Sequence, residues 1–129
     1  MWFERFLDLI SKLMPSNPVK GIELELSQLN PDKIYLENVR SILHVSATAA
    51  SEVLEAAVRQ GLLRRGVEVR CPDGYVAATA DNGQELPETV NCWHEEDGRT
   101  QRVPLPTSEL KKVTFYKLND KSRAAVVHG

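Results

Sequence analysis

The chain has 129 residues, of which 42% are hydrophobic and 26% are charged, and its formal net charge is −2. This length and composition are typical of one globular domain with its own core, and they exclude a largely disordered chain. No apolar run approaches the roughly 20 residues of a spanning helix, and no segment is basic enough to predict bulk attraction to nucleic acid.

An amphipathic helix is predicted over residues 2–14, where apolar side chains recur at helical spacing until Pro15 and Pro18. Large aromatic side chains dominate interface energetics, so this helix is a candidate surface for a protein partner or a second copy of the chain. The expected contact residues are Trp2, Phe3, Phe6 and Ile10. Packing on the chain's own core is the alternative. The helix lacks the Lys/Arg-rich face of a membrane-surface helix, so no membrane partner is expected.

The next apolar group alternates with polar residues. Ile22, Leu24 and Leu26 follow the period of two that is typical of a half-buried strand. Leucine and glutamate also favour helix, so the sequence leaves both structures open for this segment.

Two further helices are predicted, from Glu37 to His44 and from Ala50 to Gly61, because apolar residues in both keep the spacing of a core-facing helical stripe. His44 is expected to cap the first of them or to interact with its dipole. Gly61 lies where a helix commonly ends in a left-handed residue, a conformation that glycine adopts without steric cost.

A β-hairpin is predicted to follow these helices. Val67 and Val69 alternate with charged residues, residues 72–74 read Pro-Asp-Gly, and a returning strand begins at Tyr75. Further on, short strands are expected at residues 90–93, 99–103 and 113–118, and a frayed tail after them.

Two stretches between Val39 and Leu63 carry a resemblance to a known family: Val-Arg-Ser-Ile-Leu-His-Val-Ser and Ala-Ser-Glu-Val-Leu-Glu-Ala-Ala-Val-Arg-Gln-Gly-Leu-Leu. They resemble the helix-turn-recognition-helix segment of bacterial winged-helix proteins. The resemblance implies an α+β fold: a winged helix-turn-helix core with an N-terminal amphipathic helix and a small C-terminal β appendage. The expected divisions are helix and linker at 1–20, winged-helix domain at 21–80, β appendage at 81–118 and flexible tail at 119–129.

The segment after the hairpin resembles the zinc ribbon that follows a winged helix in some bacterial proteins, in which each of two knuckles reads Cys-x-x-Cys. Cys71 and Cys92 keep the first cysteine of each knuckle, and both second cysteines are missing. Structural zinc needs four ligands, so the resemblance implies a ribbon-like fold without metal, with both cysteines as small buried apolar residues. A zinc site made by Cys71, Cys92, His94 and a remote ligand is the alternative.

A cytoplasmic location is expected for this chain. Two cysteines are too few for a disulfide-stapled secreted scaffold, and charged residues such as Glu4 and Asp8 interrupt the apolar stretch that a signal peptide would need. A reducing environment is therefore the default.

If the winged-helix resemblance extends to DNA binding, the outer face of the helix predicted to end at Gly61 would enter the groove. The strand that follows it would contact phosphate. The residues in these places are Ser51, Glu52, Glu55, Arg59, Arg64 and Arg65. Two carboxylates on that face would approach phosphate unfavourably. A DNA-binding transcription regulator is therefore the second hypothesis.

The leading hypothesis is a non-catalytic protein-protein interaction adaptor or regulatory subunit on a winged-helix scaffold. The sequence has no nucleophile elbow, phosphate-binding glycine loop, His-Glu-x-x-His motif or dinucleotide fingerprint, so we expect neither catalysis nor a cofactor. The N-terminal aromatic helix or the β appendage would contact the partner. The family resemblance suggests an accessory protein of a bacterial defence or mobile-element system, an analogy at the level of fold.

Overall fold

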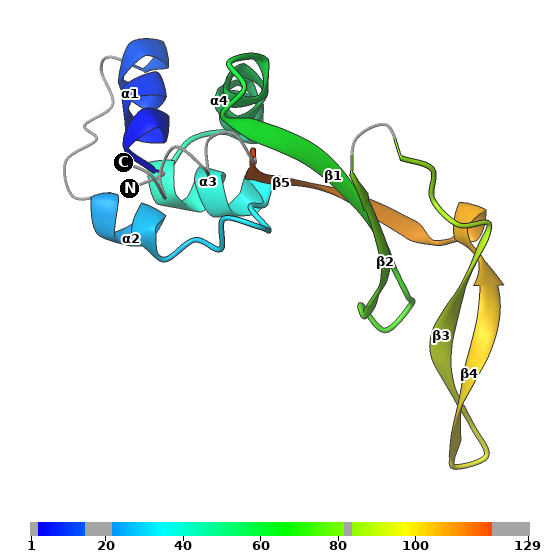
Figure 1. Cartoon of the computed structure of the whole chain (residues 1–129). Coiled ribbons are helices and arrows are strands. Elements are labelled where there is room, and N and C mark those ends of the chain that lie inside the picture. The colour runs from blue at the N-terminus through cyan, green and yellow to red at the C-terminus, as the bar shows by residue number, and fades with distance from the viewer. Residues whose placement is uncertain (1–2, 15–21, 82–83, 120–129) are drawn as a thin grey trace. The chain divides into compact units, whose positions relative to one another are not determined.

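The computed structural model describes residues 3–14, 22–81 and 84–119 (Figure 1). In these residues the chain forms four α-helices and five strands in two antiparallel sheets. The predicted α+β class is confirmed. None of the helices in the described ranges is long and apolar enough to cross a membrane.

The chain divides into two compact units. One, here called the helical unit, contains residues 1–65 and 115–129, and the other, here called the β unit, contains residues 66–114. The division between the units falls within β1 (Leu63–Arg70) and β5 (Lys111–Leu118), which are neighbours in the strand order β2-β1-β5.

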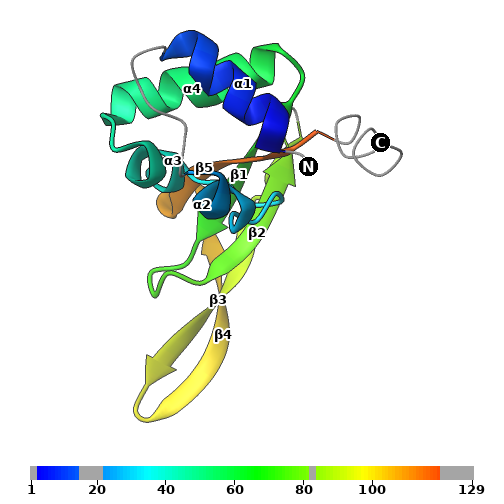
Figure 2. The same ribbon diagram turned by 90° about the vertical axis from the view of Figure 1, so that its left-hand side faces the viewer.

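The helical unit is built around α1 (Phe3–Leu13) and α4 (Ala47–Arg59), which pack against each other (Figure 2). Apolar residues of all four helices and of the strands point into one core, and burying each large side chain contributes about 1.5–3 kcal/mol before the cost of ordering it. The most deeply buried side chains of this core are Phe6, Ile10, Leu26, Ile34, Val39, Val53, Leu54 and Leu63.

The segment that the sequence left open is a short helix, α2 (Glu23–Ser27). The Leu26 amide donates to the Ile22 carbonyl at 2.9 Å, which is the spacing of a helical turn. Leu26 is completely buried, whereas Leu24 is 69% exposed. The apolar alternation therefore does not define a strand face, because only one of these leucines enters the core.

The helix α3 (Leu36–Leu43) lies where a helix was predicted and is capped at both ends. The Asn38 side chain accepts a hydrogen bond from the Tyr35 amide at 2.9 Å. At the other end His44 is the C-cap residue in the left-handed conformation, with φ of 54°. The prediction that His44 caps this helix is confirmed.

Local hydrogen bonds also define both ends of α4. The Ser46 hydroxyl accepts from the Ala49 amide at 3.1 Å and caps the N-terminus. At the C-terminus the Gly61 amide donates to the Val58 carbonyl and the Leu62 amide to the Ala57 carbonyl, which is the Schellman pattern. Gly61 has φ of 75°, so the glycine has the conformation predicted for it.

The predicted hairpin consists of β1 and β2 (Val76–Asp81), which pair antiparallel with Val67 opposite Ala80. On the other side of β1 lies β5, and within the helical unit Tyr116 of β5 exchanges two backbone hydrogen bonds of 2.7 Å with Ile34. This bridge joins the segment before α3 to the last strand. The predicted strand at residues 113–118 is therefore the one that pairs with the segment before α3.

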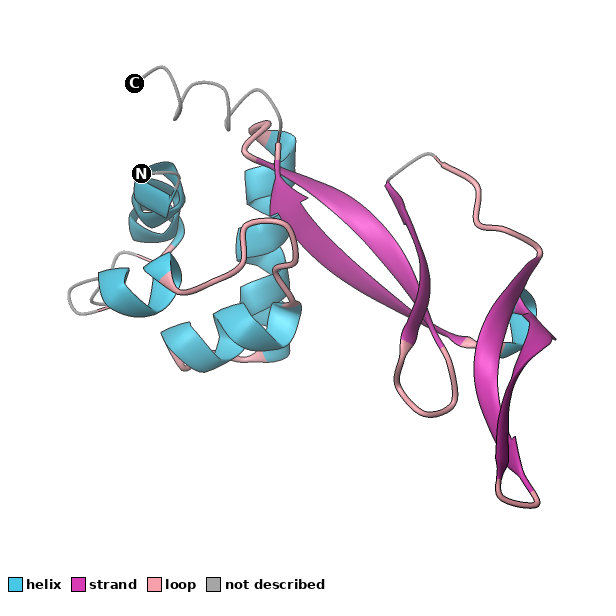
Figure 3. Ribbon diagram, turned by 60° about the horizontal axis from the view of Figure 1, so that its bottom comes forward, coloured by secondary structure: helices cyan, strands magenta, loops and turns pink. Residues whose placement is uncertain are grey.

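The second sheet is a two-stranded ribbon of β3 (Thr89–Glu96) and β4 (Arg99–Pro106), here called the arm (Figure 3). Glu96 pairs with Arg99, so the loop consists of Asp97 and Gly98 alone, and both have positive φ. This is the loop geometry that Asp-Gly favours in a hairpin. A 3₁₀ turn, Thr107–Glu109, follows the arm.

A small apolar cluster forms the interior of the β unit. Its buried members are Val69, Cys71, Val90 and Cys92, and the partly buried residues packed against them include Leu86, Leu105 and Leu110. This cluster contacts only the base of the arm, since every residue of β3 beyond Cys92 is exposed.

Candidate interaction surfaces

The first candidate surface, the aromatic helix α1, faces the interior. Phe6 and Ile10 have no exposed surface and Phe3 is 9% exposed, and all three belong to the core of the helical unit. Trp2 lies outside the described residues. Packing on the chain's own core, the alternative considered from the sequence, is the arrangement observed for these three side chains. The expectation that they contact a partner is corrected accordingly, because no surface of Phe6 or Ile10 is accessible.

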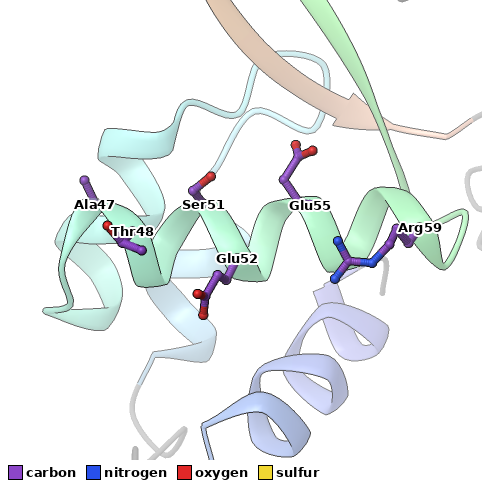
Figure 4. Close-up of a pocket in the computed structure, with 6 residues that line it drawn as sticks. All are labelled: Ala47, Thr48, Ser51, Glu52, Glu55 and Arg59. Carbon is purple, nitrogen blue, oxygen red and sulfur yellow. The ribbon is translucent and has the colours of Figure 1, made fainter.

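The second candidate surface is the outer face of α4. A shallow depression there is lined by Ala47, Thr48, Ser51, Glu52, Glu55 and Arg59 (Figure 4). Glu52 and Arg59 are exposed, whereas Ser51 and Glu55 are partly buried. The structure therefore brings together the four residues that the DNA-binding hypothesis assigned to the groove.

Glu55 is tied to two strands of the sheet. Arg65 donates from Nε to Glu55 Oε2 at 2.9 Å and from Nη2 to Oε1 at 2.6 Å, and the Tyr116 hydroxyl donates to Oε2 at 2.7 Å. Such a bidentate pair holds the carboxylate in one orientation. The contacts join α4 to β1 and β5 inside the helical unit. The Glu55 carboxylate and the Nε and Nη2 groups of Arg65 are therefore engaged in contacts within the protein.

The environment shifts the pKa values of these groups in the direction that the contacts require. The hydrogen bond from Arg65 lowers the pKa of Glu55 below its ordinary value of 4.5, against the smaller opposing effect of burial. Burial, together with the hydrogen bond to Glu55, raises the pKa of Tyr116 to about 12. The cluster is thus an ion pair with a neutral phenol over the neutral pH range.

Replacing Glu55 by glutamine is expected to lower the free energy of unfolding by about 1–2 kcal/mol at pH 7. The value is modest because the Glu55 and Arg65 side chains are 30% and 38% exposed. The folded pKa of Glu55 is lowered, so its contribution is complete above pH 4.5 and is lost as pH falls through the folded value. Urea unfolding of the variant and the wild type, at pH 7 and at several values below pH 4.5, measures this.

Glu52→Gln is the matched control for this prediction, since Glu52 is an exposed carboxylate on the same helix. Its replacement is expected to change stability by less than about 0.5 kcal/mol. Equal losses in the two variants, or a loss at Glu55 that does not shrink in acid, would show that the contacts with Arg65 and Tyr116 contribute nothing specific.

The remaining arginines near this face differ in their surroundings. Arg59 is exposed at the end of α4 and Arg64 is partly buried on β1. In the β unit, Arg70 Nε donates to the completely buried Glu68 at 2.8 Å. The arginines assigned to phosphate binding therefore do not form a set of free cations, because Arg65 is committed to Glu55.

The third candidate surface is the arm. Trp93 is 46% exposed although it is a large aromatic residue, and the Arg102 guanidinium opposite it on β4 lies 5.3 Å from the ring centroid. This is the distance of a cation-π contact. Farther along β3, His94 Nε2 lies 3.7 Å from Glu96 Oε2. The exposed part of the arm thus presents an aromatic-arginine pair next to an acidic turn.

Cys71 and Cys92 form a disulfide with Cα atoms 5.7 Å apart. The prediction that both cysteines are buried is confirmed, and their covalent pairing is a feature that the sequence did not predict. The alternative zinc site of Cys71, Cys92 and His94 is also contradicted, because disulfide sulfurs are not the thiolates that zinc requires and the His94 side chain is 57% exposed beside Glu96. The described residues contain no group of three or more candidate metal ligands.

Comparison with known proteins returns no relative: no protein-family model, curated protein or solved structure matches the chain.

Proposed function

We propose that this chain is a non-catalytic protein-protein interaction adaptor or regulatory subunit, and that the arm is its contact surface. The observation that carries the proposal is the exposure of Trp93, 46% accessible and stacked with Arg102 on a two-stranded ribbon. The sequence predicted two candidate contact surfaces, the aromatic helix and the β appendage. The aromatic face of α1 is buried, so the β appendage remains.

The chemistry of the arm favours a protein partner. Tryptophan and arginine are the residues most enriched at the energetic centre of protein interfaces. Trp93 and Arg102 lie on adjacent strands in one register pair, so one partner pocket can receive both. Beside this pair, the end of β3 carries Glu95 and Glu96 and the loop carries Asp97, with Arg99 opposite Glu96. The proposed partner is a protein with an apolar pocket for Trp93 and basic side chains that face these carboxylates.

A winged-helix scaffold is part of the proposal. The proposal rests on the order of α3, a short turn, α4, Gly61 and the β1–β2 hairpin, together with the resemblance of residues 39–63. The proposed location is the cytoplasm, and a role beside a bacterial defence or mobile-element system follows from the resemblance alone.

Replacing Trp93 by alanine is expected to weaken binding of the partner by roughly tenfold or more. The partner would be recovered by affinity purification from the native host, identified by mass spectrometry, and its affinity measured with purified proteins. Leu24→Ala is the matched control, because Leu24 is an exposed apolar residue of the helical unit. Equal affinities for the wild type and Trp93→Ala would exclude the arm as the contact surface. Size-exclusion chromatography of both proteins separates self-association from binding to another protein.

DNA binding is the second candidate, and one observation favours it. Arg65 and Tyr116 satisfy the Glu55 carboxylate, so the outer face of α4 is less acidic than its sequence suggests. Glu52 remains exposed there, and Arg65 is occupied. A DNA-binding protein would lose affinity for mixed duplex DNA steeply with salt, and Arg59→Ala would reduce that dependence. The adaptor hypothesis predicts no binding with such a salt dependence.

A further inference from the structure

An apolar cluster at its base and one disulfide hold the arm on the β unit. Among its residues only Val90 and Cys92 are buried, while residues 93–96 and 99–102 are all exposed. The backbone pairs of the arm lie within it, because β3 and β4 form a sheet separate from that of β1, β2 and β5. At the base, the Thr107 amide donates to the Glu88 carbonyl at 2.9 Å, which again joins the two ends of the arm to each other.

The disulfide links the two sheets within the β unit. Cys71 directly follows β1 and Cys92 is in the middle of β3, and their side chains lie in the small apolar cluster beside Val69 and Val90. An isolated two-stranded hairpin is marginally stable in water. A covalent link between residues 21 positions apart limits the freedom of the open chain, and it disfavours opening of the segment between the cysteines by about a hundredfold.

We propose that the Cys71–Cys92 disulfide is a redox switch that controls the position of the arm. In the oxidised protein the arm stays packed on the β unit, and in the reduced protein it is released. The proposal rests on the proposed function, since it makes the availability of an ordered contact surface depend on the thiol state. Disulfides are rare in the cytoplasm, which is the proposed location, and those that occur there are usually transient and redox-sensing.

The reaction is thiol-disulfide exchange with a dithiol reductant. One reductant thiolate attacks a sulfur of the Cys71–Cys92 bond and forms a mixed disulfide, and the other cysteine leaves as a thiolate and takes up a proton. The second reductant thiol then displaces the bound cysteine and closes the reductant's own disulfide. Two electrons and two protons pass to the protein, and the reverse reaction uses a small-molecule disulfide. Cys71 and Cys92 are 4% and 1% exposed, so attack requires a local opening of the arm.

Hydrogen exchange of the full chain in its oxidised and dithiol-reduced forms tests the proposal, with thiol alkylation and intact mass reporting the state of the cysteines. We expect no alkylation of the oxidised protein and two alkylated cysteines after reduction. Exchange of the paired amides of β3 and β4 should accelerate by as much as about a hundredfold on reduction, while exchange in α4 stays unchanged. The control is Cys71→Ala/Cys92→Ala, whose arm should exchange rapidly with and without reductant.

Two results would overturn the proposal: complete alkylation of both cysteines in protein treated with a disulfide oxidant, or an unchanged exchange of the arm after reduction. The failure of the proposed function is distinguishable from these. If the arm loosens on reduction while Trp93→Ala binds the partner normally, the redox switch is supported and the arm is rejected as the partner-binding surface. An arm that stays ordered while Trp93→Ala loses the partner would do the reverse.

Discussion

Changing Phe6 to alanine is expected to lower the free energy of unfolding by about 3–5 kcal/mol. Phe6 has no exposed surface and lies in the core of the helical unit, where the smaller side chain would leave a cavity. The loss comes from the removed apolar surface and from the contacts that neighbouring side chains no longer make. Chemical denaturation followed by circular dichroism of the helices measures it.

The control for this change is Leu13→Ala, at the exposed end of the same helix, where the side chain is 46% accessible. It should cost less than about 1 kcal/mol. The opposite pattern, a stable Phe6→Ala protein that no longer binds its partner, would show that the aromatic face of α1 is an interface, the hypothesis that the packing of α1 contradicts.

Reduction of the disulfide is expected to have the second largest effect, a loss of about 3 kcal/mol in the free energy of unfolding. The value follows from the length of chain between Cys71 and Cys92, because the bond limits the freedom of the unfolded chain. Urea unfolding of the wild-type protein, with and without a dithiol reductant, measures the difference without any change of side chain.

The double variant Cys71→Ala/Cys92→Ala controls for other effects of the reductant, since its stability should be the same in both buffers. An equal stability of oxidised and reduced wild type would contradict the prediction. A reductant effect that persists in the double variant would assign the change to something other than this bond.

Elements with local signals could be predicted from the sequence. Gly61 has the left-handed conformation that its position after the apolar stripe of α4 indicated, and His44 caps α3. The hairpin loop at Asp97 and Gly98 is also local, because both residues tolerate the positive φ that a two-residue loop requires. In each case a few neighbouring residues determine the geometry, so no knowledge of the distant chain is needed.

Features that depend on distant pairs could not be predicted in this way. Glu55, Arg65 and Tyr116 meet only because β5 returns beside β1, and the hydroxyl of Tyr116 comes from 61 positions away. The Cys71–Cys92 pair also depends on distant residues, since the two cysteines meet in an apolar cluster to which both sheets contribute. A count of two cysteines leaves free thiols, zinc and a disulfide all open.

The helix α2 shows why a short apolar pattern is ambiguous. Its five residues are compatible with both periods, and tertiary packing decides between them by burying Leu26 and leaving Leu24 in solvent. The aromatic helix was similarly ambiguous in its function, because a buried core face and a partner-binding face have the same sequence signature.

Photo-crosslinking in the native host tests the central claim most directly, that the arm is where this protein contacts its partner. A photoreactive phenylalanine would replace Thr100 in one protein and Leu24 in another; both are exposed, and Thr100 lies two positions from Arg102 on β4, so the Trp93 side chain is kept. A discrete adduct with one identified protein from position 100, and none from position 24, is the predicted result. An adduct from position 24 alone, or crosslinks from position 100 only to duplex DNA, would contradict the account.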